Sequence, residues 1–351
     1  MAPSRREFLT TATAIGIPLA AAGCTTGRED SAPAVQHSTE TETDSSVGEI
    51  YQSTIPSVTS IQVGDSGGSG FVYRDYIVTN EHVVDEAETV NVRFKEGDWA
   101  TAGVLATDVY SDLAVLSTNI PSYAPPLSFV DAIPSIGTDV LALGSPFNLE
   151  SSVSEGIISG RNRSLASPSG FSIPNTVQTD AGLDPGNSGG PLVTLDGDVA
   201  GVAVAGAGSS VGFAVSPLLA QRVLPELIEN KTYTHPYLGI SLMPVSPTIA
   251  KANDLEEVNG IYVFKLRDDG PPGQPLKGAT DTETVNGESV PIGGDTLISL
   301  AGDTIQTPAD LGTTLALKLS PGDRVNATVI RDGAKQDLTV AIGERPPPDD
   351  E

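Results

Sequence analysis

The chain has 351 residues, enough for about two domains, and its 38% hydrophobic residues can supply their cores. A formal net charge of −26, from 45 acidic and 19 basic residues, argues against a nucleic acid as partner, because phosphate would be repelled. The chain contains 37 Gly and 27 Pro but few aromatic residues, which favours many short strands joined by turns over long helices.

The acidic residues are spread along the whole chain, through segments that otherwise look folded, and only seven of the 19 basic residues are Lys. This composition is typical of globular proteins from salt-loving archaea, and we expect a halophilic protein. In molar salt the Debye length is only about 3 Å, so the self-repulsion of such a chain is screened. The alternative is an acidic protein from an organism that needs no salt.

Residues 1–24 predict an export signal, because Arg5 and Arg6 precede an apolar pair, Phe8 and Leu9. This pattern resembles the twin-arginine signal. The apolar run 10–22 that follows is too short for a bilayer, which needs roughly 20 residues. Residues 19–24 end in small residues and Cys24, and they resemble a lipobox.

Cys24 is the one cysteine, so no internal disulfide can form. We expect it to carry a lipid that anchors the protein to the extracellular face of the membrane. Ordinary signal cleavage, giving a secreted soluble protein, is the alternative. The polar segment 25–46 predicts a flexible tether, and His37 within it is expected to be inert.

From residue 47 to 215, short apolar runs alternate with Gly, Asp and Asn turns. About twelve short strands at this spacing predict a mainly β protein with a pair of small antiparallel barrels. The predicted strands cover residues 57–63, 70–73, 76–79, 89–94, 102–107, 113–117, 139–144, 153–159, 176–179, 191–194, 198–205 and 211–215.

Three segments of this region carry candidate chemistry. His82 follows a strand, Asp112 directly precedes one, and Ser188 lies in a glycine-rich loop, 179–192. Taken singly, a structural histidine, a strand-edge aspartate and a glycine-rich hairpin are the plainer interpretations. Their order along the chain is nevertheless that of the chymotrypsin-type Ser-His-Asp triad, and glycines beside an attacking serine let backbone N–H groups converge on the oxyanion.

These segments, together with residues 68–71, 142–146 and 155–160, resemble the HtrA/DegP family of trypsin-like serine proteases, over roughly residues 47–342. The resemblance implies a two-barrel, chymotrypsin-like protease domain with Ser188 as nucleophile, His82 as base and Asp112 as orienting acid. It also implies that the N–H groups of Gly186, Asn187 and Ser188 form the oxyanion hole. No metal or cofactor is needed.

Two departures from the family pattern affect the expected site. Asp184 stands where the family usually has Asn and adds negative charge near the nucleophile. The strand expected to pair with substrate reads Val202, Ala203 and Val204, without the family's Asn-Thr. No Asp is evident that could receive Lys or Arg, so we expect small aliphatic residues before the cut.

A helical linker is predicted over residues 216–234, interrupted at Pro225. Residues 235–344 resemble the family's small α/β PDZ domain. Its opening residues, Tyr237, Leu238, Gly239 and Ile240, are expected to hold a peptide C-terminus.

The remaining parts of this C-terminal region are assigned from their composition. His235, which precedes a proline, is interpreted as a linker residue. The polar stretch 279–291 predicts an inserted loop, and residues 345–351 predict a disordered tail. A small α/β domain without a peptide site is the alternative interpretation of the whole region.

The resemblance implies a serine endopeptidase that cleaves unfolded or misfolded proteins outside the cell membrane. It also implies a homotrimer in which an aromatic residue near the start of the barrel, Tyr51, packs between subunits. The rival interpretation is a non-catalytic chaperone or peptide-binding module that keeps the barrels as a scaffold.

The net charge of −26 leads to a prediction about thermal stability and salt. Melting temperature should rise steadily between dilute buffer and molar sodium chloride, because salt screens repulsion among the acidic side chains. Thermal unfolding followed by circular dichroism across a salt series measures this. A melting temperature unchanged in the absence of salt would refute the halophilic interpretation.

Overall fold

The computed structural model describes residues 46–145, 152–167, 169–204 and 211–348. The predicted export signal, Cys24, His37 and nearly all of the predicted tether lie outside these ranges. Within them, no helix combines the length and apolar character needed to cross a membrane.

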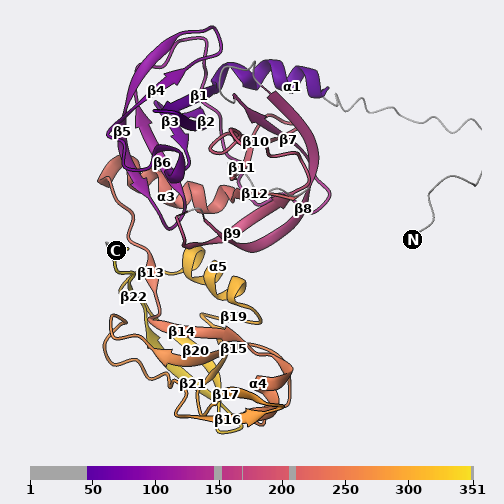
Figure 1. The fold of residues 1–351 in the computed structure, drawn as a ribbon, viewed down its shortest axis with the longest axis vertical. Coiled ribbons are helices and arrows are strands. Elements are labelled where there is room, and N and C mark those ends of the chain that lie inside the picture. Colours follow the sequence, from indigo (N-terminus) through magenta and orange to yellow (C-terminus); the bar gives the residue numbers. More distant parts are fainter. Residues whose placement is uncertain (1–45, 146–151, 168, 205–210, 349–351) are drawn as a thin grey trace, which may run out of the picture. The chain divides into compact units, whose positions relative to one another are not determined.

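The first barrel closes in the order β1-β2-β3-β6-β5-β4 (Figure 1). Helix α1, Val47–Thr54, and a short 3₁₀ helix, Ile55–Ser57, precede it in the chain. Ser46 and Glu49 form a capping box at the N-terminus of α1. The strands are β1 Val58–Val63, β2 Ser66–Tyr73, β3 Tyr76–Thr79, β4 Thr89–Arg93, β5 Trp99–Asp108 and β6 Leu113–Ser117.

The second barrel closes in the order β10-β11-β12-β9-β8-β7. Its strands are β7 Asp139–Gly144, β8 Ser152–Ala166, β9 Ser172–Thr179, β10 Pro191–Thr194, β11 Val199–Val204 and β12 Gly212–Val215. The two closed barrels confirm the predicted fold class, and each predicted strand has a counterpart. The main difference is β8, which extends well past the predicted end.

Helix α3, Pro217–Asn230, follows the second barrel and continues through Pro225 without interruption. The predicted break at this residue is therefore wrong. Ser216 caps the N-terminus, and fully buried apolar side chains lie both before and after the proline. Packing of this continuous apolar face outweighs the roughly 3 kcal/mol that an interior proline costs a helix.

The C-terminal region is a six-stranded antiparallel sheet with two helices, as expected of a PDZ domain. The sheet runs β14-β15-β18-β20-β21, and β19 pairs with β18. The strands are β14 Ile240–Pro244, β15 Ile261–Leu266, β18 Thr296–Leu300, β19 Asp303–Thr304, β20 Arg324–Arg331 and β21 Ala334–Ala341, with helices α4 Pro247–Ala252 and α5 Pro308–Lys318. A short ladder of β13, Pro236–Tyr237, and β22, Gly343–Glu344, brings the two ends of the domain together.

Two sequence predictions in this domain differ from the structure. The predicted loop 279–291 is a hairpin of β16, Asp281–Val285, and β17, Glu288–Ile292. Its turn residues Asn286 and Gly287 both have positive φ, which is the pairing that favours a tight hairpin.

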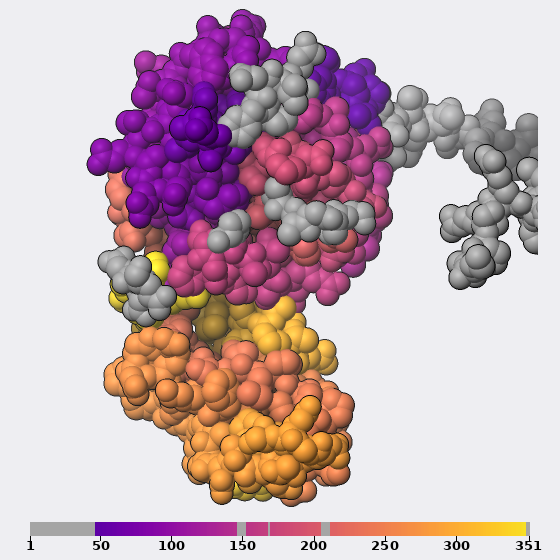
Figure 2. Space-filling model, in the orientation of Figure 1, coloured from indigo at the N-terminus to yellow at the C-terminus, as the bar shows by residue number. Residues whose placement is uncertain are grey.

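The predicted tail is ordered at its start. The Tyr110 hydroxyl donates to the Pro346 carbonyl at 2.7 Å, and Figure 2 shows the last described residues, in yellow, against the barrel. Residues 349–351 lie outside the described part.

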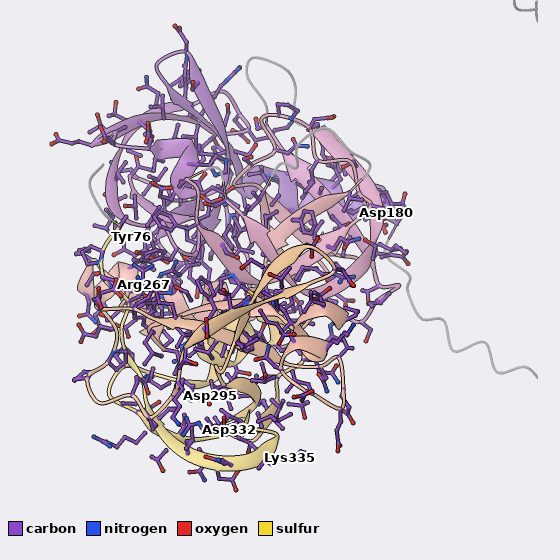
Figure 3. All side chains as sticks on the ribbon, turned by 60° about the horizontal axis from the view of Figure 1, so that its bottom comes forward. Tyr76, Asp180, Arg267, Asp295, Asp332 and Lys335 are labelled. Carbon is purple, nitrogen blue, oxygen red and sulfur yellow. The ribbon has the colours of Figure 1, made fainter. Side chains whose placement is uncertain are left out.

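A buried ion pair in the PDZ domain generates a stability prediction. The Arg331 guanidinium donates two 2.7 Å hydrogen bonds to the carboxylate of Asp295, which is fully buried and labelled in Figure 3. Arg331→Met would leave that carboxylate unpaired, so the free energy of unfolding should fall by about 3 kcal/mol or more.

Urea unfolding, followed through the transition of this domain, measures the loss. The matched control is Lys318→Met, which removes a 2.6 Å pair with Asp303 whose lysine is 57% exposed. This change should cost about 1 kcal/mol or less. Equal losses in the two variants would contradict the prediction.

Candidate active site

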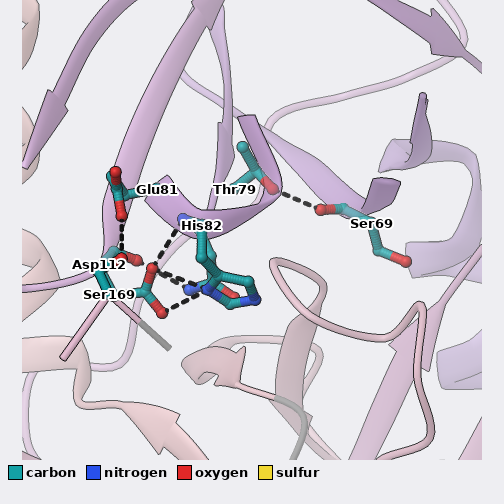
Figure 4. Close-up of polar contacts among 7 residues, drawn as sticks. Ser69, Thr79, Glu81, His82, Asp112 and Ser169 are labelled. Atoms are coloured by element: carbon teal, nitrogen blue, oxygen red, sulfur yellow. Dashed lines mark hydrogen bonds and ion pairs between the residues drawn. The ribbon is translucent and has the colours of Figure 1, made fainter. Parts of the chain in front are cut away.

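His82 lies on a single turn of helix, α2 Glu81–Val84, which begins directly after β3. Val83 and Val84 are buried in the core of the first barrel and so fix the turn. The imidazole projects toward Asp112, and its Nδ1 atom lies 2.9 Å and 2.8 Å from the two carboxylate oxygens (Figure 4). Two residues 30 positions apart in the sequence thus meet as a hydrogen-bonded pair.

Asp112 is fully buried at the start of β6. Its Oδ1 also accepts the backbone N–H of His82 at 3.1 Å, and its own carbonyl accepts the Asn80 side-chain amide at 2.9 Å. A carboxylate facing Nδ1 selects the tautomer that carries its proton there. Nε2 of His82 then has a lone pair with which to accept a proton.

The Ser188 loop is docked against the strand and helix that carry His82. The Ser188 carbonyl accepts the Ser69 N–H at 2.8 Å. A methyl group added to Gly189 would lie 2.1 Å from Thr79 Oγ1, and one added to Gly68 would lie 2.7 Å from the Ser188 carbonyl oxygen and 2.8 Å from Val83. Glycine at 68 and 189 therefore lets the loop of the second barrel reach the segment that bears the imidazole.

Ser69 holds the Ser188 loop in place and is a site residue that was not predicted from the sequence. Its hydroxyl donates to the Gly186 carbonyl at 2.6 Å and accepts the Ser145 N–H at 2.9 Å. Of the three predicted oxyanion donors, the Asn187 N–H is already used, because it donates to the Asp184 carbonyl at 3.0 Å. A serine flanked by glycines was the available signal for Ser69, but it does not reveal which carbonyl the hydroxyl holds.

The predicted substrate strand, Val202 to Val204, is part of β11. The N–H and carbonyl of Ala203 bond to Gly190 and Gly189, both at 2.8 Å, and so attach the nucleophile loop to the barrel. Val202 and Val204 pair with β12, because the backbone groups of successive residues point to opposite edges of a strand. The backbone groups of these three residues that are bonded in the structure thus hold the barrel and the Ser188 loop, and pairing with a substrate stays a prediction.

Glu81 lies beside the His82–Asp112 pair and accepts the Ser169 hydroxyl at 2.7 Å (Figure 4). Ser169 belongs to the connection between β8 and β9, so this hydrogen bond joins the two barrels across the site. Burial raises the pKa of the Glu81 carboxyl above its usual value, and the nearby negative charge of Asp112 adds to the rise.

The predicted peptide-binding residues run from the end of β13, at Tyr237, through Leu238 and Gly239 to the start of β14, at Ile240. Leu238 is buried in the PDZ core, and Gly239 has a φ of 68°, in the left-handed region. Among the described strands, β14 pairs with β15 alone, so it is an edge strand of the sheet. A cavity of about 300 Å³ lies along it, bounded by Leu242, by α5 and by side chains of the second barrel.

Across the described ranges, no three His, Cys, Asp or Glu side chains gather as a metal ion would require. The chemistry that the site residues offer is that of a buried carboxylate, an imidazole and a serine in a glycine-rich loop.

The raised pKa of Glu81 generates a pH prediction. A carboxyl whose pKa is higher in the folded protein binds its proton more tightly there, so ionisation above its usual pKa lowers stability. Glu81→Gln keeps an acceptor for Ser169 but cannot ionise. The variant should melt higher than wild type at pH 7, and the difference should vanish toward pH 4, measured by thermal unfolding. A constant difference at both pH values would contradict the assignment.

Two family models match the chain. Residues 68–202 match the trypsin-like peptidase domain, and residues 236–342 match the PDZ domain. A probable periplasmic serine endoprotease, DegP-like, of Pseudomonas fulva is 34% identical over 292 residues, covering 80% of this chain and 57% of the relative. Its counterpart in Halomonas elongata is 32% identical over 287 residues, covering 80% and 56%. The chain thus spans little more than half the length of these relatives.

Solved structures agree with this relationship. The HtrA-type protease AlgW with a tripeptide has a TM-score of 0.68 and 28% identity, covering 87% of this chain and 99% of that one. The serine endoprotease from Yersinia pestis has a TM-score of 0.60 and 27% identity, covering 86% and 98%. Because a trypsin-like peptidase domain is followed by a PDZ domain, and the relatives and solved structures are named DegP-like or HtrA-type proteases, the chain belongs to the HtrA/DegP family of trypsin-like serine proteases.

Proposed function

We propose that the chain is a serine endopeptidase that cleaves unfolded or misfolded proteins outside the cell membrane through an acyl-enzyme. The observation that carries this proposal is the buried Asp112 carboxylate bound to Nδ1 of His82, with the Ser188 loop docked against the same segment. The names of the relatives and of the solved structures, all serine or HtrA-type endoproteases, support it.

In the proposed mechanism, Ser188 attacks the scissile carbonyl while Nε2 of His82 accepts its proton. The ionised Asp112 stabilises the imidazolium and holds its orientation. The imidazolium then gives the proton to the leaving amine, and water attacks the acyl-enzyme by the same route. Losing one oxyanion donor typically lowers the rate by about 10²–10³-fold. The hydrogen bond from the Ser69 hydroxyl to the Gly186 carbonyl, which fixes the loop that carries these donors, therefore affects kcat.

We expect small aliphatic residues before the cut. Leu183, five positions before the nucleophile, lies over Gly212, where an added methyl group would come within 2.6 Å of it. An apolar side chain packed over a glycine of the strand suits an uncharged aliphatic group, and it gives a Lys or Arg side chain no ion-pair partner.

The PDZ domain is proposed to bind peptide C-termini. An open strand edge at β14 suits the addition of a peptide as a further strand, and the left-handed turn at Gly239 suits a carboxylate nest. Solved relatives were captured with a decapeptide and a tripeptide. The cavity beside β14 also touches the second barrel, through Pro174.

Three further parts of the proposal rest on resemblance. They are export by the twin-arginine route, a lipid anchor at Cys24, and a homotrimer. Tyr51, the residue expected between subunits, is half-buried against the core of its own chain. The relatives named periplasmic support an extracytoplasmic location in general.

Removing the nucleophile tests the enzymatic proposal. Wild type should degrade unfolded casein in molar salt, and Ser188→Ala should lose activity by about 10⁴-fold or more, because the triad acts as a unit. Release of acid-soluble peptide measures the rate. The substitution removes one hydroxyl and leaves every glycine of the loop in place, so the loss reports on the nucleophile and not on the loop's shape.

A fluorophosphonate probe separates an enzyme from a non-catalytic peptide-binding protein. Covalent labelling of wild type, absent in Ser188→Ala, supports the enzyme. Casein loss at equal rates in the two forms, or wild type that never takes the label, would show that the proposal is wrong.

A further inference from the structure

The chain contains a second buried Asp–His pair that the proposed mechanism does not use. Nε2 of His235 lies 2.9 Å from both carboxylate oxygens of Asp108, although the two residues are 127 positions apart. Each is only 7% exposed. Asp108 ends β5 in the first barrel, whereas His235 directly precedes β13, the first strand of the PDZ domain.

Asp108 also holds the turn that ends at the catalytic aspartate. Its Oδ2 accepts the Ser111 N–H at 3.1 Å and accepts the Ser111 hydroxyl as well. Asp112 follows at once with a φ of 54°, in the left-handed region. A non-glycine residue in such a conformation is strained and persists only where its surroundings hold it.

Further contacts of this turn come from both ends of the PDZ domain, beside the Phe171 ring of the second barrel, which meets Tyr110 edge-on at 4.8 Å. The Tyr110 ring meets the His235 ring edge-on, with centroids 5.3 Å apart, and the Arg345 guanidinium lies 3.6 Å from the Tyr110 centroid. The Arg345 backbone N–H donates to the His235 carbonyl at 2.9 Å. His235, just before the domain, and Arg345, just after it, therefore both contact the turn that leads to Asp112.

We propose that Asp108 is a positioning residue for the reaction, and that His235 holds it in place from the root of the PDZ domain. The route is short: His235 to the Asp108 carboxylate, that carboxylate to Ser111, and Ser111 to the backbone of Asp112. Loosening either end of the route lets the catalytic carboxylate drift from Nδ1 of His82. The inference rests on the proposed function, because it concerns the efficiency of that triad.

Two variants break the route at different points. His235→Phe keeps the ring packing but removes the donor to Asp108, and it should lower kcat about 3–10-fold. Asp108→Ala removes the whole anchor and should lower kcat about 10–100-fold, the range expected of a misplacement of about 1 Å. KM should stay within about twofold, because the route acts on the carboxylate and not on substrate contacts.

The assay uses an internally quenched peptide with Val before the cut and an amidated C-terminus, so that a PDZ carboxylate site plays no part. Rescue distinguishes positioning from general stability. His235→Gln, which restores a side-chain N–H, should recover most of the kcat lost in His235→Phe. If Asp108→Ala does not fold, the His235 pair of variants still decides the matter.

Asn162→Gly is the matched control. Asn162 joins the second barrel to α5 of the PDZ domain through a 2.8 Å bond to Asp310, and glycine tolerates its φ of 52°. This variant loosens the attachment elsewhere and should keep the wild-type kcat. A control that loses as much kcat as His235→Phe would overturn the inference, as would an unchanged kcat in His235→Phe.

The same experiment separates this inference from the proposed function. Wild type that cleaves the peptide, with normal kcat in His235→Phe and Asp108→Ala, sinks the positioning role alone. Wild type that neither cleaves the peptide nor takes a fluorophosphonate label sinks the proposed function, and the positioning role with it.

Discussion

The site depends on one close approach between two barrels. Ser188 belongs to the second barrel and His82 to the first, and the backbone at Gly189 presses against Thr79 and Ser69 where the barrels touch. A side chain at Gly189 would occupy space already filled by those atoms, and its φ of 83° is also unfavourable for other residues. The Gly189 N–H, which donates to the Ala203 carbonyl, and the Gly190 carbonyl, which accepts the Ala203 N–H, then attach the loop to β11. The proposed triad therefore depends on the interface between the barrels.

Much of the fold followed from local patterns. Short apolar runs between turn residues predicted the strands of both barrels, because the short runs and the turns that separate them are enough to recognise the strands of an antiparallel sheet. The predictions at Pro225 and at residues 279–291 were wrong because they considered local composition alone. A proline reads as a break, yet buried side chains on both sides keep α3 whole, and a polar stretch reads as a loop, yet Asn286 and Gly287 turn it into a hairpin. In both places tertiary packing or turn geometry prevailed over composition.

The site was predictable where its residues sit in recognisable segments and unpredictable where it depends on distant contacts. His82 and Asp112 were expected to pair, and they do. Ser69, Asp108 and His235 act through hydrogen bonds spanning about a third of the chain, which no local pattern records. The neighbours of Val202 to Val204 could not be predicted either, because strand alternation alone does not say which edge another strand already covers.

The ladder between β13 and β22 has a consequence for how this architecture can change. Pro236 lies opposite Glu344, so the chain leaves for the PDZ domain and returns from it at nearly the same point. His235 and Arg345 stand just outside that ladder, on the peptidase side of the junction. A different recognition module could be grafted between them without altering the contacts that reach the turn of Asp112. Modular exchange of the C-terminal domain and preservation of the catalytic geometry are therefore compatible in this chain.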